Sequence, residues 1–171
     1  MSSKLDLLNI INQFLIQKGE SLQEEEVTLH PPVKLSEVVA RAYDRNTRIK
    51  ISSIADPEDV AVVYYNRLDL PILFGAEQVP VDIDFYTVEE AVARLNSLYD
   101  IEIEMGDLKN FEMLTGYKAK IVIGQSYKFI EDSELIIYPK TDLTYIEDFS
   151  DRFHNYIHFT LPTTLEGVPD E

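Results

Sequence analysis

The chain has 171 residues, of which 45% are apolar and 11% aromatic, enough to build the core of one ordinary domain or two small ones. It contains no cysteine, which excludes disulfides, thiolate nucleophiles and cysteine-ligated zinc. With 31 acidic and 15 basic residues its formal net charge is −16, and the Lys and Arg residues are scattered singly, so we expect neither nucleic acid nor an anionic membrane as a partner.

No apolar run reaches the roughly 18–20 residues that a membrane-spanning helix needs. The first residues also lack the basic-then-apolar layout and the small-residue cleavage site of a signal peptide. We therefore expect a soluble protein that is synthesised in the cytoplasm.

The first half opens with a predicted helix over residues 5–18, where apolar side chains recur at i, i+3 and i+4 spacing and Gly19 follows as a stop. An acidic turn is expected over 21–26. Residues 27–33 predict a short strand that two prolines interrupt, because proline cannot donate to a strand ladder.

The next stretch, 34–46, leaves helix and irregular structure open, with Ser36 as the N-cap if a helix forms. Residues 47–54 alternate, and 59–68 are β-branched and aromatic, so the two predict a hairpin. Residues 69–85 are expected to be a connector between domains, because two prolines and a glycine punctuate them.

The clearest predicted helix covers residues 87–99, where Thr87 and Glu90 have the spacing of a capping box. A short extended piece and a turn are expected over 100–111, followed by strands over 117–124 and 133–140. Farther on, the pattern predicts a helical turn within 141–153, a last strand over 155–162 and a polar tail.

Two similar segments, "VVYYNRLDL" and "IIYPKTDL", each cover the end of a predicted strand and the start of the following turn, and we call them the strand exits. The offset is constant at 73 (138 − 65 = 73), and the matched pairs are Tyr65 with Tyr138, Arg67 with Lys140, Asp69 with Asp142 and Leu70 with Leu143. In the two predicted helices, Ile11-Asn12 matches Leu95-Asn96 at an offset of 84 (96 − 12 = 84). Chance similarity between common strand and turn words is the alternative to a true repeat.

These matches predict an α+β protein of two tandem units, each a helix with a small antiparallel sheet, related as a pseudo-repeat. The first unit is expected over residues 1–76 and the second, diverged unit over 77–143. Residues 144–171 are expected to be a C-terminal extension.

Four stretches carry a resemblance to a known kind of protein: "LLNIIN", "ESLQEEEVTL", "RNTRIKI" and "VVYYNRLDL". In this order they resemble a module of virion structural proteins from large, contractile-tailed bacteriophages. The resemblance covers residues 7–70 well and 87–143 loosely. The chain departs from it in "KLSEVVARAYD", where such modules tend to be rich in Gly and Pro. The resemblance implies a component of a virion that is made in the host cytoplasm, with no catalytic residues to carry over.

Signals for chemistry are weak. His154 and His158 have helical metal-ligand spacing, but Asn155 stands where a zinc protease would need a glutamate. Asp82 and Asp84 form a carboxylate pair with neither a phosphate-binding loop nor a third carboxylate. The stretch "IGQSY" lacks the second glycine of a serine-nucleophile turn. We expect no catalytic residue, no bound metal and no cofactor.

Tyrosine is abundant, with ten residues, and it suits protein interfaces through its large area and polar tip. The interface candidates therefore gather at the two strand exits: Tyr64, Tyr65, Arg67, Asp69, Tyr138, Lys140, Asp142 and Tyr145. Ordinary strand packing of the tyrosines, and a structural role for the arginine and aspartate in the turn, are the alternatives.

Together these observations predict a non-enzymatic structural protein of a tailed-phage virion, which binds other virion proteins and copies of itself. The alternative function is that of an acidic inhibitor which imitates DNA and blocks a host nucleic-acid enzyme. Such a mimic would need two rows of carboxylates at the spacing of phosphates.

Overall fold

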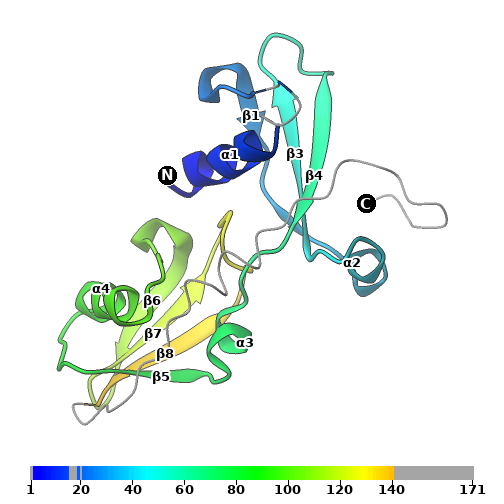
Figure 1. Cartoon of the computed structure of the whole chain (residues 1–171). Coiled ribbons are helices and arrows are strands. Elements are labelled where there is room, and N and C mark those ends of the chain that lie inside the picture. Colours follow the sequence, from blue (N-terminus) through cyan, green and yellow to red (C-terminus); the bar gives the residue numbers. More distant parts are fainter. Residues whose placement is uncertain (1, 16–18, 20, 141–171) are drawn as a thin grey trace. The chain divides into compact units, whose positions relative to one another are not determined.

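The computed structural model describes residues 2–15, 19 and 21–140 (Figure 1). These residues form a mixed α and β structure with four α-helices and two small sheets. The chain divides into two compact units between Arg67 and Leu68, nine residues before the expected boundary (76 − 67 = 9). The reason is that Leu68, Leu70 and Leu73 are buried in the core of the second unit.

The first unit contains two α-helices, a short 3-10 helix and four strands. In chain order these are α1 (Ser2–Leu15), η2 (Glu24–Glu26), β1 (Val27–Leu29), β2 (Val33–Lys34), α2 (Glu37–Tyr43), β3 (Thr47–Ser53) and β4 (Val60–Tyr65). The predicted first helix, acidic turn, broken strand and hairpin are confirmed. The undecided stretch forms α2, whose first turn is capped by the Ser36 hydroxyl accepting from the Val39 N–H.

The first sheet is antiparallel, with β3 at its centre. One side of β3 pairs with β1 and then with β2, while the other side pairs with β4. His30, Pro31 and Pro32 separate β1 from β2, because the prolines have no N–H to donate. The two short strands therefore act as one interrupted strand along the edge of β3.

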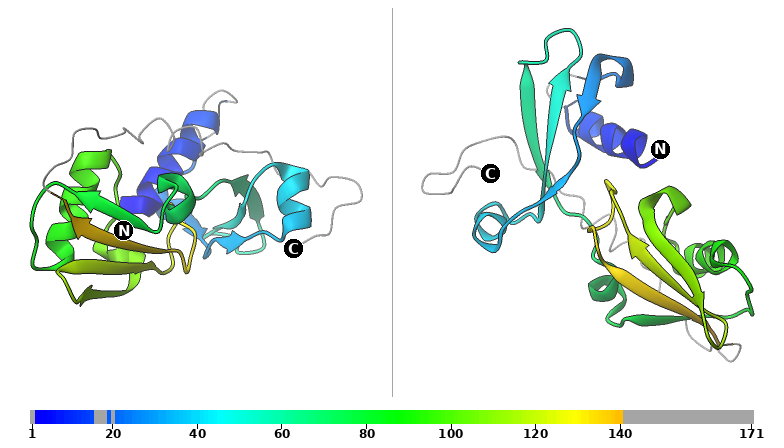
Figure 2. Two further views of the ribbon diagram at one scale, coloured as in Figure 1. Left: turned by 90° about the horizontal axis from the view of Figure 1, so that it is seen from below. Right: turned by 180° about the vertical axis from the view of Figure 1, so that it is seen from behind.

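Both faces of the first sheet carry buried side chains. On one face Tyr64 stacks on Tyr43 of α2, with 4.0 Å between ring centroids. On the other face Ile49, Ile51 and Tyr65 are buried. Helix α1 lies beside β1 (Figures 1 and 2) and contributes a buried stripe made of Leu7, Leu8 and Ile11.

The second unit contains two α-helices, a 3-10 helix and four strands. In chain order these are α3 (Leu70–Phe74), β5 (Gln78–Val81), α4 (Val88–Tyr99), η3 (Met105–Asp107), β6 (Leu108–Leu114), β7 (Lys118–Ile123) and β8 (Glu134–Pro139). The predicted helix over 87–99 and the strands over 117–124 and 133–140 are confirmed. The expected elements within 141–162 lie outside the described residues.

The strand order of the second sheet is β5-β8-β7-β6, and β5 runs parallel to β8. The prediction of an antiparallel sheet is therefore wrong for this pair. The supposed connector holds α3 and β5, because Pro71 fits the first turn of a helix and Pro80 is tolerated in an edge strand. For the region of β6 the sequence predicted only an extended piece and a turn, because residues 109–112 show no alternation of apolar and polar side chains. In the structure all four of these residues are exposed.

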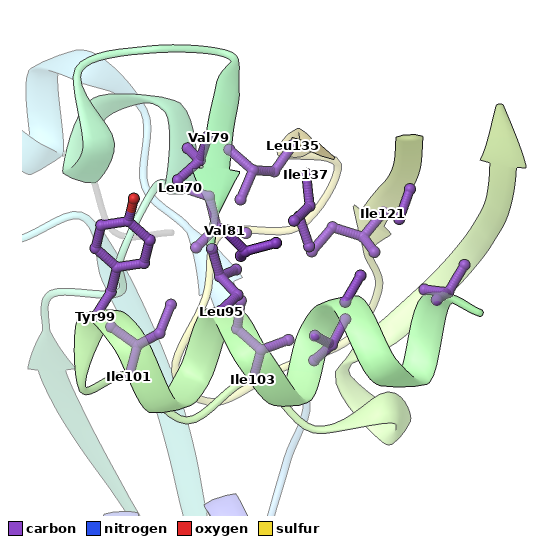
Figure 3. Packing of buried hydrophobic residues seen from close by; sticks show 14 of the residues in the cluster. Leu70, Val79, Val81, Leu95, Tyr99, Ile101, Ile103, Ile121, Leu135 and Ile137 are labelled. Atoms are coloured by element: carbon purple, nitrogen blue, oxygen red, sulfur yellow. The ribbon is translucent and has the colours of Figure 1, made fainter. Parts of the chain in front are cut away.

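A single apolar core holds the second unit together (Figure 3). Leu95 of α4 meets Ile121, Leu135 and Ile137 of the sheet, and all four side chains are fully buried. The Tyr99 hydroxyl donates to the backbone oxygen of Pro80 at 2.8 Å, and burial raises the pKa of this phenol. The hydroxyl therefore stays protonated and ties the end of α4 to β5.

One arrangement occurs in both units, directly after α1 and α4. Asn12 donates from Nδ2 to the Leu22 backbone oxygen and accepts at Oδ1 from the Leu22 N–H, both at 2.7 Å. Asn96 makes the same two bonds with Ile103, at 2.8 and 2.9 Å. In each unit a 3-10 helix begins two residues later and leads directly into β1 or β6. We call this arrangement the asparagine clamp.

The two strand exits, in contrast, differ. Tyr65 lies opposite Thr47 and is 1% exposed, on the face that carries Ile49. Tyr138 is half-buried and alternates with Ile137, so it lies on the face of the second sheet that points away from the core. The matched tyrosines therefore do not occupy equivalent places, since a shift of one residue along a strand reverses the face.

Candidate protein-interaction surfaces

Three of the residues predicted for an interface are buried inside the first unit. Tyr64, Tyr65 and Arg67 are 7%, 1% and 1% exposed. Tyr64 packs against α2, and Tyr65 belongs to the opposite face of the first sheet. We therefore do not retain these three residues as contacts for another chain.

The other predicted interface residues lie in the second unit or outside the described residues. Asp69, at the N-cap of α3, and Tyr138 are half-buried, whereas Lys140 is exposed. The Nζ atom of Lys118 lies 5.9 Å from the centroid of the Tyr138 ring, a cation–π contact on the outer face of the sheet. Asp142 and Tyr145 lie outside the described residues.

Arg67 is part of a hydrogen-bond network between two stretches that carried the family resemblance. Its backbone N–H donates to Asn46 Oδ1 at 2.8 Å, and its backbone oxygen accepts from Asn46 Nδ2 at 2.8 Å. Its Nε donates to Thr47 Oγ1 at 2.9 Å, and the Asn46 N–H donates to Asn66 Oδ1. The segments "RNT" and "NRL" are therefore joined by hydrogen bonds where β3 begins and β4 ends. These bonds give both segments a structural role.

The acidic pair Asp82 and Asp84 is divided in the structure. Both follow β5, and Asp82 accepts two hydrogen bonds from Arg94 of α4, at 2.6 and 2.7 Å. These hydrogen bonds hold the pKa of the Asp82 carboxyl below its usual value and raise the pKa of Arg94. Asp84 is exposed. The Asp82 carboxylate fixes the entry to α4.

The remaining candidates for chemistry have structural partners or lie outside the described residues. His30 Nε2 lies 2.8 Å from Ser52 Oγ, and Ser126 donates to the buried carboxylate of Asp107 at 3.0 Å. His154 and His158 are not among the described residues. Within the described ranges no group of three His, Cys, Asp or Glu side chains is placed to hold a metal ion, and no helix is long and apolar enough to cross a membrane.

Strand β6 forms an open edge of the second sheet. Among the described residues it pairs only with β7, so its outer backbone N–H and C=O groups are available to another strand. Phe111 in its middle is 44% exposed. A groove of about 240 Å³ crosses the sheet from β6 over β7 to the start of β8, lined by Lys109, Asn110, Phe111, Glu112, Lys120, Val122, Asp132 and Glu134. An edge with an adjacent groove is what strand addition requires.

The hairpin between β6 and β7 adds an exposed aromatic pair. Tyr117, which ends the turn, is 63% exposed and contacts Tyr86 edge-to-face, with 5.8 Å between ring centroids. Its φ is +57°, a backbone conformation that disfavours a bulky side chain. A glycine would adopt this conformation without strain. Neither Tyr86 nor Tyr117 was among the interface residues predicted from the sequence, although an aromatic residue directly after Gly116 indicates an aromatic side chain in a turn.

Comparisons with known proteins identify a family but no characterised relative. A model described as a family of unknown function (DUF7941) matches residues 2–143. The chain therefore belongs to this family. No curated protein and no solved structure matches the chain.

Proposed function

We propose that this chain is a non-enzymatic structural subunit of a tailed-phage virion, which binds neighbouring virion proteins. The observation that carries the proposal is the open edge of β6, with exposed Phe111 beside it and the Tyr86–Tyr117 pair at its hairpin. The resemblance of residues 7–70 to a virion module supports the setting. Backbone pairing would supply affinity, and the groove beside the edge would select the partner's side chains.

The edge also has features that limit unguided pairing. Lys109 and Glu112 place charges along β6, and a register shift interrupts the ladder between Leu108 and Asn110. Lys109 is held in an ion pair with Asp132. Charges and bulges on edge strands oppose aggregation between identical edges. This favours a specific neighbour, including a second copy in a fixed geometry, over non-specific association.

We also propose that the two units are a pseudo-repeat. The two asparagine clamps support this, as does the order of strands: β1, β3 and β4 are neighbours in the first unit, and β6, β7 and β8 are neighbours in the second.

The direct test is mass spectrometry of purified phage particles from cells that produce this chain. We expect the chain at a fixed ratio to the major structural proteins. Its absence from the particle would contradict the proposal. A stoichiometric complex with a host nucleic-acid enzyme that weakens steeply with salt would instead favour the DNA-mimic function.

A surface variant tests the site within the particle. Phe111→Asp changes a side chain that is 44% exposed, and incorporation into particles should fall about tenfold or more, while amide NMR shifts away from β6 should show a retained fold. Val38→Asp, at an exposed position of α2, is the matched control and should leave incorporation unchanged. Equal incorporation of both variants would contradict the proposal that the β6 edge binds a neighbouring virion protein.

A further inference from the structure

An apolar hollow lies at the end of the first sheet, where β1 begins and where β3 turns into β4. It is open to solvent and has a volume of about 530 Å³. Its apolar wall consists of Leu22, Val27, Ile51, Ile54, Ala55 and Ala61. Its polar part consists of Ser52, Ser53, Glu25, Glu26 and Asp59. None of these lining residues is Lys or Arg.

The rim of this hollow is built on paired backbone. The Ile54 N–H donates to the Glu26 oxygen at 2.9 Å, and the Ser53 N–H donates to the Asp59 oxygen at 3.0 Å. The turn is closed by the Asp59 N–H, which donates to the Asp56 oxygen at 2.9 Å. The carboxylates of the rim are therefore carried by ordered elements, which lowers the entropy cost of binding.

The charge around the hollow has one sign. Residues 21–29 include three glutamates, Glu24 to Glu26, and residues 51–61 include Asp56, Glu58 and Asp59. All six are exposed, and neither stretch contains Lys or Arg. Ile54 stands among them with 57% of its surface exposed. An apolar wall beside an acidic rim would suit a ligand that offers an apolar side chain flanked by positive charge.

We propose that this hollow binds a basic segment of a neighbouring protein chain. An apolar side chain of the partner would pack against Ile54, and Lys or Arg on either side of it would pair with Glu25, Glu26 and Asp59. The inference rests on the proposed function, because it takes a protein as the ligand. Nucleic acid is disfavoured as an occupant because its phosphates would be repelled. A second copy of this chain is disfavoured at this hollow because its Lys and Arg residues are scattered singly.

The experiment measures binding of a short fluorescent peptide made of lysine, leucine and alanine, by anisotropy at about 0.15 M salt. Two variants alter the hollow: Ile54→Ser, and the triple variant Glu25→Gln, Glu26→Gln, Asp59→Asn. Each should weaken binding about tenfold or more. A peptide with serine in place of leucine keeps the charge and should bind about tenfold more weakly to the unaltered protein.

The matched control removes the same charge elsewhere, through Glu37→Gln, Asp44→Asn and Glu131→Gln. These three residues are exposed and lie outside the hollow. The control should weaken binding about twofold or less. NMR spectra of all variants should show unchanged amide shifts away from the substituted sites, and the peptide should shift the amides of residues 25–27 and 51–61.

Three results would overturn the inference. They are equal weakening by the two triple variants, no effect of Ile54→Ser, and no binding by the unaltered protein. The two proposals can fail separately. Peptide binding by a chain that is missing from virions would overturn the proposed function alone, and a virion protein that ignores the peptide would overturn the hollow alone.

Discussion

Asn12 and Asn96 fix the segments that follow α1 and α4 with the same two hydrogen bonds, yet the sheets beyond them differ. In the first unit, α2 is inserted between β2 and β3 and covers one face through Tyr43 and Tyr64. In the second unit, a three-residue turn joins β6 to β7, and no helix is inserted there. Among the described residues both β1 and β6 are edge strands, so the inserted α2 changes a face of the first sheet and not its edge.

The largest expected difference between the units lies at the two strand exits, where Arg67 and Lys140 are matched in sequence. Arg67→Ala removes a buried side chain with a hydrogen bond to Thr47, and Lys140→Ala removes an exposed one. We expect the first substitution to lower the free energy of unfolding by about 3 kcal/mol and the second by about 0.5 kcal/mol or less. Urea unfolding followed by NMR peaks of each unit measures both. Similar losses would show that the two exits are equivalent after all.

The asparagine clamps offer a way to sharpen the comparison. Asn12→Ala and Asn96→Ala each remove two hydrogen bonds and leave backbone groups of Leu22 or Ile103 without a partner. We expect each change to cost about 1–3 kcal/mol in its own unit. Amide hydrogen exchange should accelerate at Leu22 in the first variant and at Ile103 in the second. A clamp whose loss leaves exchange unchanged would contradict the shared role.

The helix caps differ by a smaller amount. Thr87 accepts from the Glu90 N–H at 3.2 Å, whereas Ser36 accepts from the Val39 N–H at 3.5 Å. Thr87→Ala should destabilise α4 by about 1 kcal/mol, and Ser36→Ala should cost α2 less, because its bond is longer. Hydrogen exchange in the first turn of each helix reports the change. A larger effect at Ser36 would reverse this ranking.

The smallest expected effect is the loss of the Asp82–Arg94 interaction at low pH. The Asp82 pKa is lowered by hydrogen bonds from Arg94, so this pair stabilises the second unit above the unfolded pKa of 3.8 and loses its contribution as the pH falls through the lower folded value. In Arg94→Gln the pKa of Asp82 should rise toward 3.8. Carboxyl carbon NMR across this acidic range measures the shift. An unchanged titration would mean that Arg94 does not set the Asp82 pKa.

Helices and central strands were predictable because their signals are local. The stripe of α4 and the cap at Thr87 sufficed for that helix, and alternation sufficed for β3. Strand β6 was missed because an exposed edge strand has no buried alternation. Strand β5 was not predicted because its partner, β8, follows more than fifty residues later. No local sequence pattern indicates that two such distant segments pair in parallel.

The candidate site was less predictable than the fold. Sequence reasoning favoured the tyrosines at the strand exits, but alternation alone does not say which face another helix will cover, and α2 covers Tyr64. The exposed Tyr117 was not found because its exposure depends on the turn that follows β6. The hollow was not found because it joins residues 22–27 to residues 51–61 across strand pairs.

The most direct test of the account places a photo-crosslinking amino acid at Phe111 and irradiates both the free protein and assembled particles. We expect a covalent adduct between this position in β6 and another virion protein, in particles only. Particles that contain the chain but give no adduct at Phe111 would contradict the claim that the open edge of the second unit binds the neighbouring subunit.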